Sequence, residues 1–108
     1  MSDAIDDRRK AFEEKFRLDQ DLQFKVSARR DKLLGLWLGE RLGLGGDKLA
    51  DYAASVVIAD LAKPGDEDVI GKVMADIKER NVSVTEAEVR AKLAELAVTA
   101  KEQIQAEH

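Results

Sequence analysis

The most informative absences in this 108-residue chain are those of cysteine, proline and aromatic residues. It has no cysteine, one proline, three phenylalanines, one tryptophan and one tyrosine. Without cysteine, the chain cannot form a disulfide framework, a thiolate metal site or a thiol nucleophile. The single proline and the few runs of β-branched residues leave little material for a sheet. We therefore expect one all-α domain.

Long apolar runs are also absent. No stretch approaches the ~20 apolar residues that span a bilayer, and the opening Met-Ser-Asp-Ala has neither the basic flank nor the apolar run of a signal peptide. The only histidine is the terminal His108, so a histidine-based general base, triad or metal cluster is not expected. We predict a cytoplasmic protein that does not insert into the membrane, is not an enzyme and holds no metal.

Charge is plentiful but mixed in sign. Charged residues make up 37% of the chain, with a net charge of −4. Residues 1–32 hold nine basic and eight acidic side chains, whereas the remainder holds nine basic and fourteen acidic. A nucleic-acid partner would require a clearly basic face. The balanced N-terminal charges are better suited to a protein surface that carries both signs.

Two phenylalanines near the N-terminus are separated from the other apolar residues of their predicted helix. Phe12 and Phe16 are one helical turn apart, and the polar residues Asp19, Gln20, Asp21 and Gln23 lie on either side of Leu22, where the apolar stripe of the bundle begins. An exposed aromatic pair on a charged helix is typical of a segment that docks into another protein. The alternative is that both rings fold back onto the bundle.

The chain divides into a frayed or disordered N-terminal segment, residues 1–18, and a bundle, residues 19–108. An isolated helix of ~18 residues is marginal in water. Punctuation and periodicity predict four helical segments: about 19–42, 47–63, 66–81, and a fourth that begins near Thr85 and whose apolar seam runs to Ile104. Because the connections are short, we expect an antiparallel four-helix bundle.

Local signals mark the ends of these helices. We expect Gly43 to close the first helix in the left-handed conformation and Asp47 to cap the second. Thr85 and Glu88 have the spacing of a capping box at the start of the fourth. We expect Trp37 near the centre of the bundle.

The apolar stripes follow helical periodicity in each segment. In the first helix the stripe is Leu22, Val26, Leu33 and Trp37; in the second it is Leu49, Ala53, Val56, Val57 and Leu61; in the third it is Val69, Ile70, Val73, Met74 and Ile77; in the fourth it is Val89, Leu93, Leu96, Ala100 and Ile104.

The N-terminal motifs carry a family resemblance. The order is Asp6-Asp7-Arg8, Ala11-Phe12-Glu13, Lys15-Phe16, Phe24-Lys25, then the block ARRDKLLGLW at residues 28–37. With Leu42-Gly43-Leu44 and the segment Pro64 to Val69, the sequence resembles the zeta subunit, the small inhibitor of the F-type ATP synthase of alphaproteobacteria. Departures are mild: Ile5 stands where an aromatic residue is common, Leu18 where a small residue is common, and Asp31 where Asn is common.

The resemblance implies a protein inhibitor of F1-ATPase. In that family the N-terminal segment enters a catalytic interface between alpha and beta subunits, reaches toward the gamma rotor, and blocks ATP hydrolysis while largely sparing synthesis. It implies a monomeric free protein that is peripheral at the inner membrane through F1. Carried over to this chain, the inhibitory residues are Arg8, Arg9, Lys10, Phe12, Glu13, Glu14, Lys15, Phe16, Arg17 and Asp19.

Other candidate sites are weaker. Lys25, Arg29, Arg30 and Lys32 form a basic cluster that is either a solvated helix face or a site for an acidic patch or a nucleotide phosphate, with ATP or ADP as the ligand. The glycines between Gly43 and Gly46 fit a turn, and the acidic residues from Asp66 to Asp68 fit a first helical turn.

Two functions from other classes stay open. One is a nucleotide-responsive regulatory bundle that uses the basic cluster, and the other is an oligomeric helical scaffold. Nucleotide titration and sedimentation would separate these from an F1 inhibitor.

Overall fold

The computed structural model describes the backbone of residues 2–63 and 65–107 and, within these ranges, the side chains from Gln20 onward. It contains four α-helices and, among the described residues, no strand. The helices are α1 (Ser2–Arg41), α2 (Asp47–Ala62), α3 (Asp66–Glu79) and α4 (Glu86–Glu107). The predicted all-α fold is confirmed.

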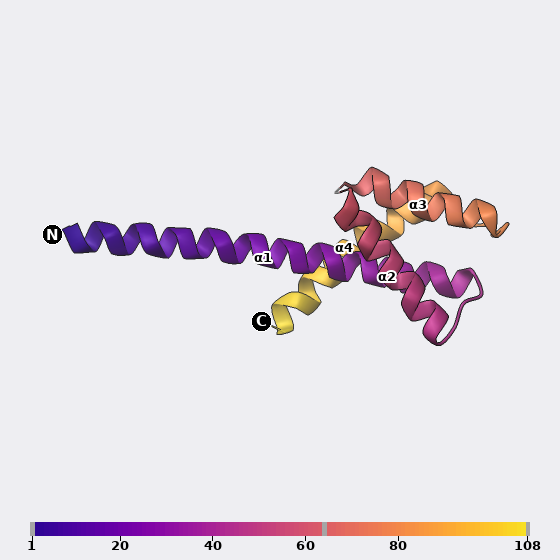
Figure 1. The fold of residues 1–108 in the computed structure, drawn as a ribbon, viewed down its shortest axis with the longest axis horizontal. Coiled ribbons are helices and arrows are strands. Elements are labelled where there is room, and N and C mark those ends of the chain that lie inside the picture. Colours follow the sequence, from indigo (N-terminus) through magenta and orange to yellow (C-terminus); the bar gives the residue numbers. More distant parts are fainter. Residues whose placement is uncertain (1, 64, 108) are drawn as a thin grey trace.

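Successive helices reverse direction along the long axis, and α2 and α4 cross α1 obliquely (Figure 1). Helix α1 packs against both α2 and α4, while α3 packs against α2 and α4. The 40 residues of α1 span about 60 Å, which sets the long dimension of a molecule measuring 67 × 25 × 22 Å. The first half of α1 extends beyond the other helices.

The core is formed by apolar side chains from all four helices and their connections. Leu34 and Leu38 on α1 are completely buried, as are Val56 on α2, Val69 and Val73 on α3, and Val89 on α4. The predicted stripe of α4 matches the buried residues of that helix, and the stripe of α3 does so except at Met74, which is only partly buried. In α2 the stripe is only partly right, because Leu61 is 53% exposed.

Helices α1 and α2 approach closely because α1 carries glycine at the contact. A Cβ atom placed on Gly35 would lie 2.6 Å from the Cα atom of Ala53, and one on Gly39 would lie 2.5 Å from Cδ1 of Leu49. The glycines are one helical turn apart and so face α2 together. This close packing also brings polar side chains of the two helices together, such as Arg30 of α1 and Asp60 of α2.

The helix ends follow local signals, with one exception. Gly43 has φ 84°, and the amide of Leu44 donates to the carbonyl of Gly39, which is the geometry of a Schellman motif. The amide of Glu88 donates to Oγ1 of Thr85, so the predicted cap of α4 is confirmed. The prediction that Asp47 caps α2 is wrong: Gly46 is the N-cap, and Asp47 lies in the first turn, where its charge complements the helix dipole.

The apolar stripe predicted for α1 lies toward α4. Leu22 and Val26 lie beside Ile104, and the ammonium group of Lys92 lies 5.7 Å from the ring centroid of Trp37. The prediction that Trp37 lies at the centre is wrong, because α1 is packed on two sides. The most buried residues of α1, Leu34 and Leu38, lie between its α2-facing and α4-facing sides. Trp37 is only partly buried and packs at the edge of the core.

Candidate functional site

The predicted inhibitory residues lie on the projecting half of α1. From Ser2 to Asp19 the helix measures about 27 Å, and Figure 1 shows it running away from the other three helices. The side chains of Phe12 and Phe16 lie outside the described part, as do those of the charged residues between Arg8 and Asp19. The fraying expected for residues 1–18 in the free protein stays a prediction.

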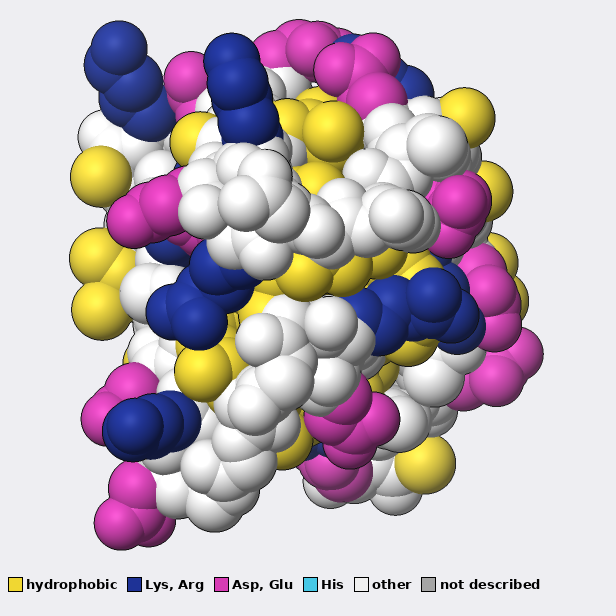
Figure 2. All heavy atoms as spheres, turned by 90° about the vertical axis from the view of Figure 1, so that its right-hand side faces the viewer, with side chains coloured by type: hydrophobic (Ala, Val, Ile, Leu, Met, Phe, Trp, Pro, Cys, Tyr) yellow, Lys and Arg dark blue, Asp and Glu magenta, His cyan; other side chains and the backbone are white. Residues whose placement is uncertain are grey.

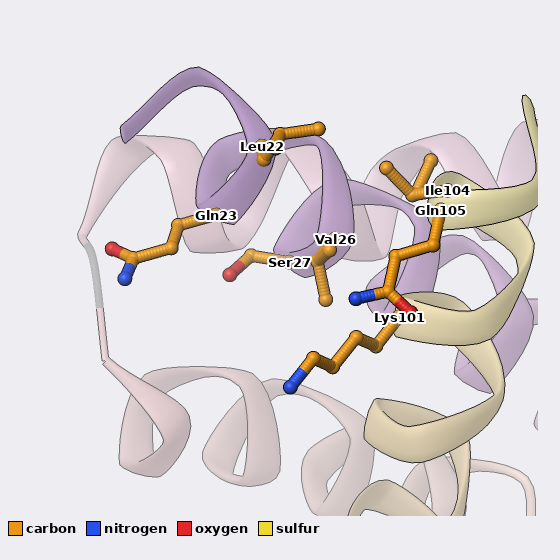
Figure 3. A pocket seen from close by; sticks show the side chains of 7 residues that line it. All are labelled: Leu22, Gln23, Val26, Ser27, Lys101, Ile104 and Gln105. Atoms are coloured by element: carbon orange, nitrogen blue, oxygen red, sulfur yellow. The ribbon is translucent and has the colours of Figure 1, made fainter. Parts of the chain in front are cut away.

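A shallow groove marks the point where α1 leaves the bundle. Its volume is about 530 Å³, and it lies between one side of α1 and the last turns of α4 (Figure 3). Leu22, Val26 and Ile104 provide its apolar lining, and the ammonium-bearing side chain of Lys101 lies along its opening. Because residues of both helices line the groove, α1 still lies beside α4 at Leu22.

Arg29 fixes α1 to the C-terminal end of α4. Its Nη1 atom donates to Oε1 of Gln103 at 2.9 Å, and its Nη2 atom lies 2.8 Å from Oε1 of Glu107. Because the two acceptors lie one helical turn apart on α4, the planar guanidinium bridges them. Arg29 therefore stabilises the base of the projecting segment.

Arg30 points to a different part of the molecule. Its guanidinium contacts Oδ1 of Asp31 at 3.1 Å and Oδ1 of Asp66 at 3.0 Å. Arg29 thus binds side chains of α4, whereas Arg30 binds carboxylates of α1 and α3. Lys25 and Lys32 are exposed. The predicted basic cluster does not converge on one point, and a nucleotide phosphate would have to displace these carboxylates.

Sequence reasoning missed a buried carboxyl group in the α1–α2 interface. Asp31 is completely buried. It lies on the same helical face as Leu34 and Leu38, and this spacing is the only signal that could have revealed it. Burial first, and then the nearby carboxyl group of Asp60, raise the pKa of Asp31 to about 7.

The acidic residues at the start of α3 are engaged by cations. Glu67 accepts two hydrogen bonds from the guanidinium of Arg90, at 3.0 and 2.9 Å, and this pairing lowers the pKa of Glu67. Asp66 accepts from Arg30. These contacts fit the prediction of a structural first turn, and no set of three metal-ligating side chains is found among the described residues.

The end of the molecule opposite the N-terminus has a mixed surface. Basic and acidic side chains are interspersed there around apolar surface (Figure 2). On this face neither sign of charge forms the continuous patch that a nucleic-acid surface requires. Across residues 2–63 and 65–107, none of the helices has the length and hydrophobicity needed to cross a membrane.

Comparison with known proteins gives a match along almost the whole chain. The family model described as ATPase inhibitor subunit zeta matches residues 1–103. A protein solved by solution NMR is 48% identical to the chain, with a TM-score of 0.71, and the match covers 81% of this chain and 99% of that one. No curated protein matches the chain.

Proposed function

This chain belongs to the ATPase inhibitor subunit zeta family, and from that premise we propose that it blocks ATP hydrolysis by inserting its N-terminal segment into F1. Membership of this family implies a regulatory role as an ATPase inhibitor. In the proposed mechanism, residues 3–19 enter a catalytic interface between alpha and beta subunits and reach toward gamma.

The architecture of α1 is the observation that supports this mechanism best. One continuous helix carries both the projecting segment and the buried Leu34 and Leu38. A segment about 27 Å long can therefore enter a partner while the bundle stays outside it. The family match also begins at residue 1, so it includes the projecting segment.

Inhibition of this kind requires no chemical step. A helix wedged into an interface that opens and closes during each catalytic cycle stabilises one conformer over the others. Rotation in the direction of hydrolysis then stalls at that conformer. Rotation in the direction of synthesis opens the interface and releases the helix, so synthesis is largely spared.

Phe12 and Phe16 are the proposed anchors. Ordering a segment on its partner consumes about 2–5 kcal/mol, and burial of each phenylalanine ring supplies about 1.5–3 kcal/mol. The charged residues around the rings, Arg8, Arg9, Lys10, Glu13, Glu14, Lys15, Arg17 and Asp19, set the register and speed the encounter. The two rings therefore decide whether binding is net favourable.

The test is ATP hydrolysis by F1 from the same organism, titrated with the full-length chain and with the Phe12→Ala/Phe16→Ala double variant. We expect the double variant to need at least about 100-fold more protein for half-inhibition, because about 3 kcal/mol or more of burial is lost. Both proteins should have the same helical content by circular dichroism.

Phe24→Ala is the matched control. Phe24 lies on the same helix, beyond the projecting segment, and is 57% exposed, so its truncation should leave inhibition within about threefold of the full-length protein. A double variant that inhibits as strongly as the full-length chain would contradict the assignment of the anchors. Full-length protein that binds F1 without slowing hydrolysis would contradict the mechanism.

A further inference from the structure

The interface between α1 and α2 contains a carboxyl group that is not fully hydrogen-bonded. Asp31 is completely buried, and its Oδ1 atom accepts hydrogen bonds from the guanidinium of Arg30. Its Oδ2 atom has no hydrogen-bond partner among the described residues. An ionised oxygen in that position would bear its full desolvation cost.

The groups that face Asp31 act on its ionisation in opposite directions: the guanidinium of Arg30 favours the ionised form, and the carboxyl group of Asp60 disfavours it. Nη2 of Arg30 lies 3.1 Å from Oδ1 of Asp31 and 3.8 Å from Oδ2 of Asp60, which comes from α2. Nη1 of the same guanidinium contacts Asp66 of α3 at 3.0 Å. Three carboxyl groups from three helices thus share one cation. If all three were ionised, the cluster would carry an excess of two negative charges.

Among the described residues, no other cation compensates for this excess. Arg90 of α4 lines the same surface hollow as Arg30, but its guanidinium is paired with Glu67 and Glu86. The amide of Gly65 donates to Oδ1 of Asp60, which satisfies one oxygen of that residue. Asp31 and Asp60 also line the same small cavity, of about 30 Å³. Because both carboxyl groups also lie within 3.8 Å of Nη2 of Arg30, they lie close together in the interface.

We propose that Asp31 and Asp60 form a proton-binding site, in which one proton taken from solvent links α1 to α2. The protonated Asp31 donates its O–H to the carboxylate of Asp60, so Oδ2 of Asp31 gains the partner that it lacks when ionised. The cluster then holds one cation and two carboxylates. This site does not depend on the proposed mode of F1 inhibition.

The raised pKa of Asp31, about 7, agrees with this arrangement. Because the pKa is higher in the folded chain than the ordinary aspartate value near 3.9 in the unfolded chain, the folded state binds the proton more tightly. The stability that the proton contributes is complete below about pH 4 and is lost as the pH rises to about 7. Above that pH the two helices are held together without the proton.

The test compares the full-length chain with its Asp31→Asn variant by urea unfolding at pH 5 and pH 8. The asparagine amide donates to Asp60 at every pH and does not titrate. We compare the unfolding equilibrium constant of the wild type with that of Asp31→Asn. Their ratio should rise roughly 100-fold from pH 5 to pH 8, because each pH unit between the unfolded and folded pKa values of Asp31 changes it tenfold. A ratio that changes less than threefold overturns the proposal.

A second measurement does not depend on the folding of the variant. The carboxyl ¹³C resonance of Asp31 in the wild-type chain, followed from pH 3 to pH 9, should titrate with a midpoint at or above pH 6, and in Asp60→Asn the midpoint should fall by more than one unit. A wild-type midpoint below pH 6 overturns the proposal. So does a midpoint that is insensitive to Asp60→Asn.

Discussion

The two halves of α1 differ in what they contact. From Asp31 to Arg41 the helix packs against α2 on one side and α4 on the other, with Leu34 and Leu38 completely buried between them. From Ser2 to Asp19 it extends beyond the other helices. A single helix therefore joins a region held by the core to a region with no neighbouring helix.

This difference separates the requirements of folding from those of binding. Substitutions in the packed half act on the free energy of unfolding, because they change the core or the approach of α2. Under the proposed mechanism, substitutions in the projecting half act on binding to F1. The groove at Leu22 and the Arg29 contacts with α4 mark the boundary between the two.

The largest stability effect is expected in the packed half. Leu34→Ala should lower the free energy of unfolding by about 2–5 kcal/mol, because it removes a fully buried side chain and leaves a cavity. Urea unfolding followed by circular dichroism measures the loss. The matched control is Leu61→Ala, which makes the same chemical change at a position that is 53% exposed and should cost less than about 1 kcal/mol. Equal losses at the two positions would contradict the assignment of the core.

A smaller effect is expected from the close approach of α1 and α2. Gly35→Ala should destabilise the chain by about 1–3 kcal/mol, since the new methyl group would lie 2.6 Å from Cα of Ala53 and force the helices apart. Gly71→Ala is the control. Gly71 lies inside α3, and a Cβ atom placed on it would extend into open space, so the change should stabilise the helix by about 0.5–1 kcal/mol.

Thermal unfolding measures both effects: the unfolding midpoint should fall in Gly35→Ala and rise in Gly71→Ala. If Gly35→Ala were as stable as Gly71→Ala, the tight contact between α1 and α2 would be absent in solution. The placement of Asp31 opposite Asp60 would then need revision as well.

Much of the fold could be predicted from the sequence, because its signals are local. The capping box at Thr85 and the seam from Val89 to Ile104 need only the periodicity of one helix, and both agree with the structure. The α1 stripe from Leu22 to Trp37 predicted only the face that meets α4. Its second face, against α2, is formed by glycines, which carry no hydrophobic signal.

The polar interior was harder to predict. An aspartate is rarely buried, so sequence reasoning did not include Asp31 among the core residues. Its burial depends on how closely α2 approaches through Gly35, and that is a tertiary property. For the same reason the sequence grouped Arg29 with Arg30, although Arg29 contacts α4 and Arg30 contacts α3.

The most direct test of this division is ATP hydrolysis by F1 titrated with a chain that begins at Asp19, together with the thermal unfolding of that chain. We predict an unfolding midpoint within about 3 °C of the full-length value, since less than about 0.5 kcal/mol of stability is removed, and no inhibition of hydrolysis. A shortened chain that still inhibits F1 as the full-length chain does would contradict the account.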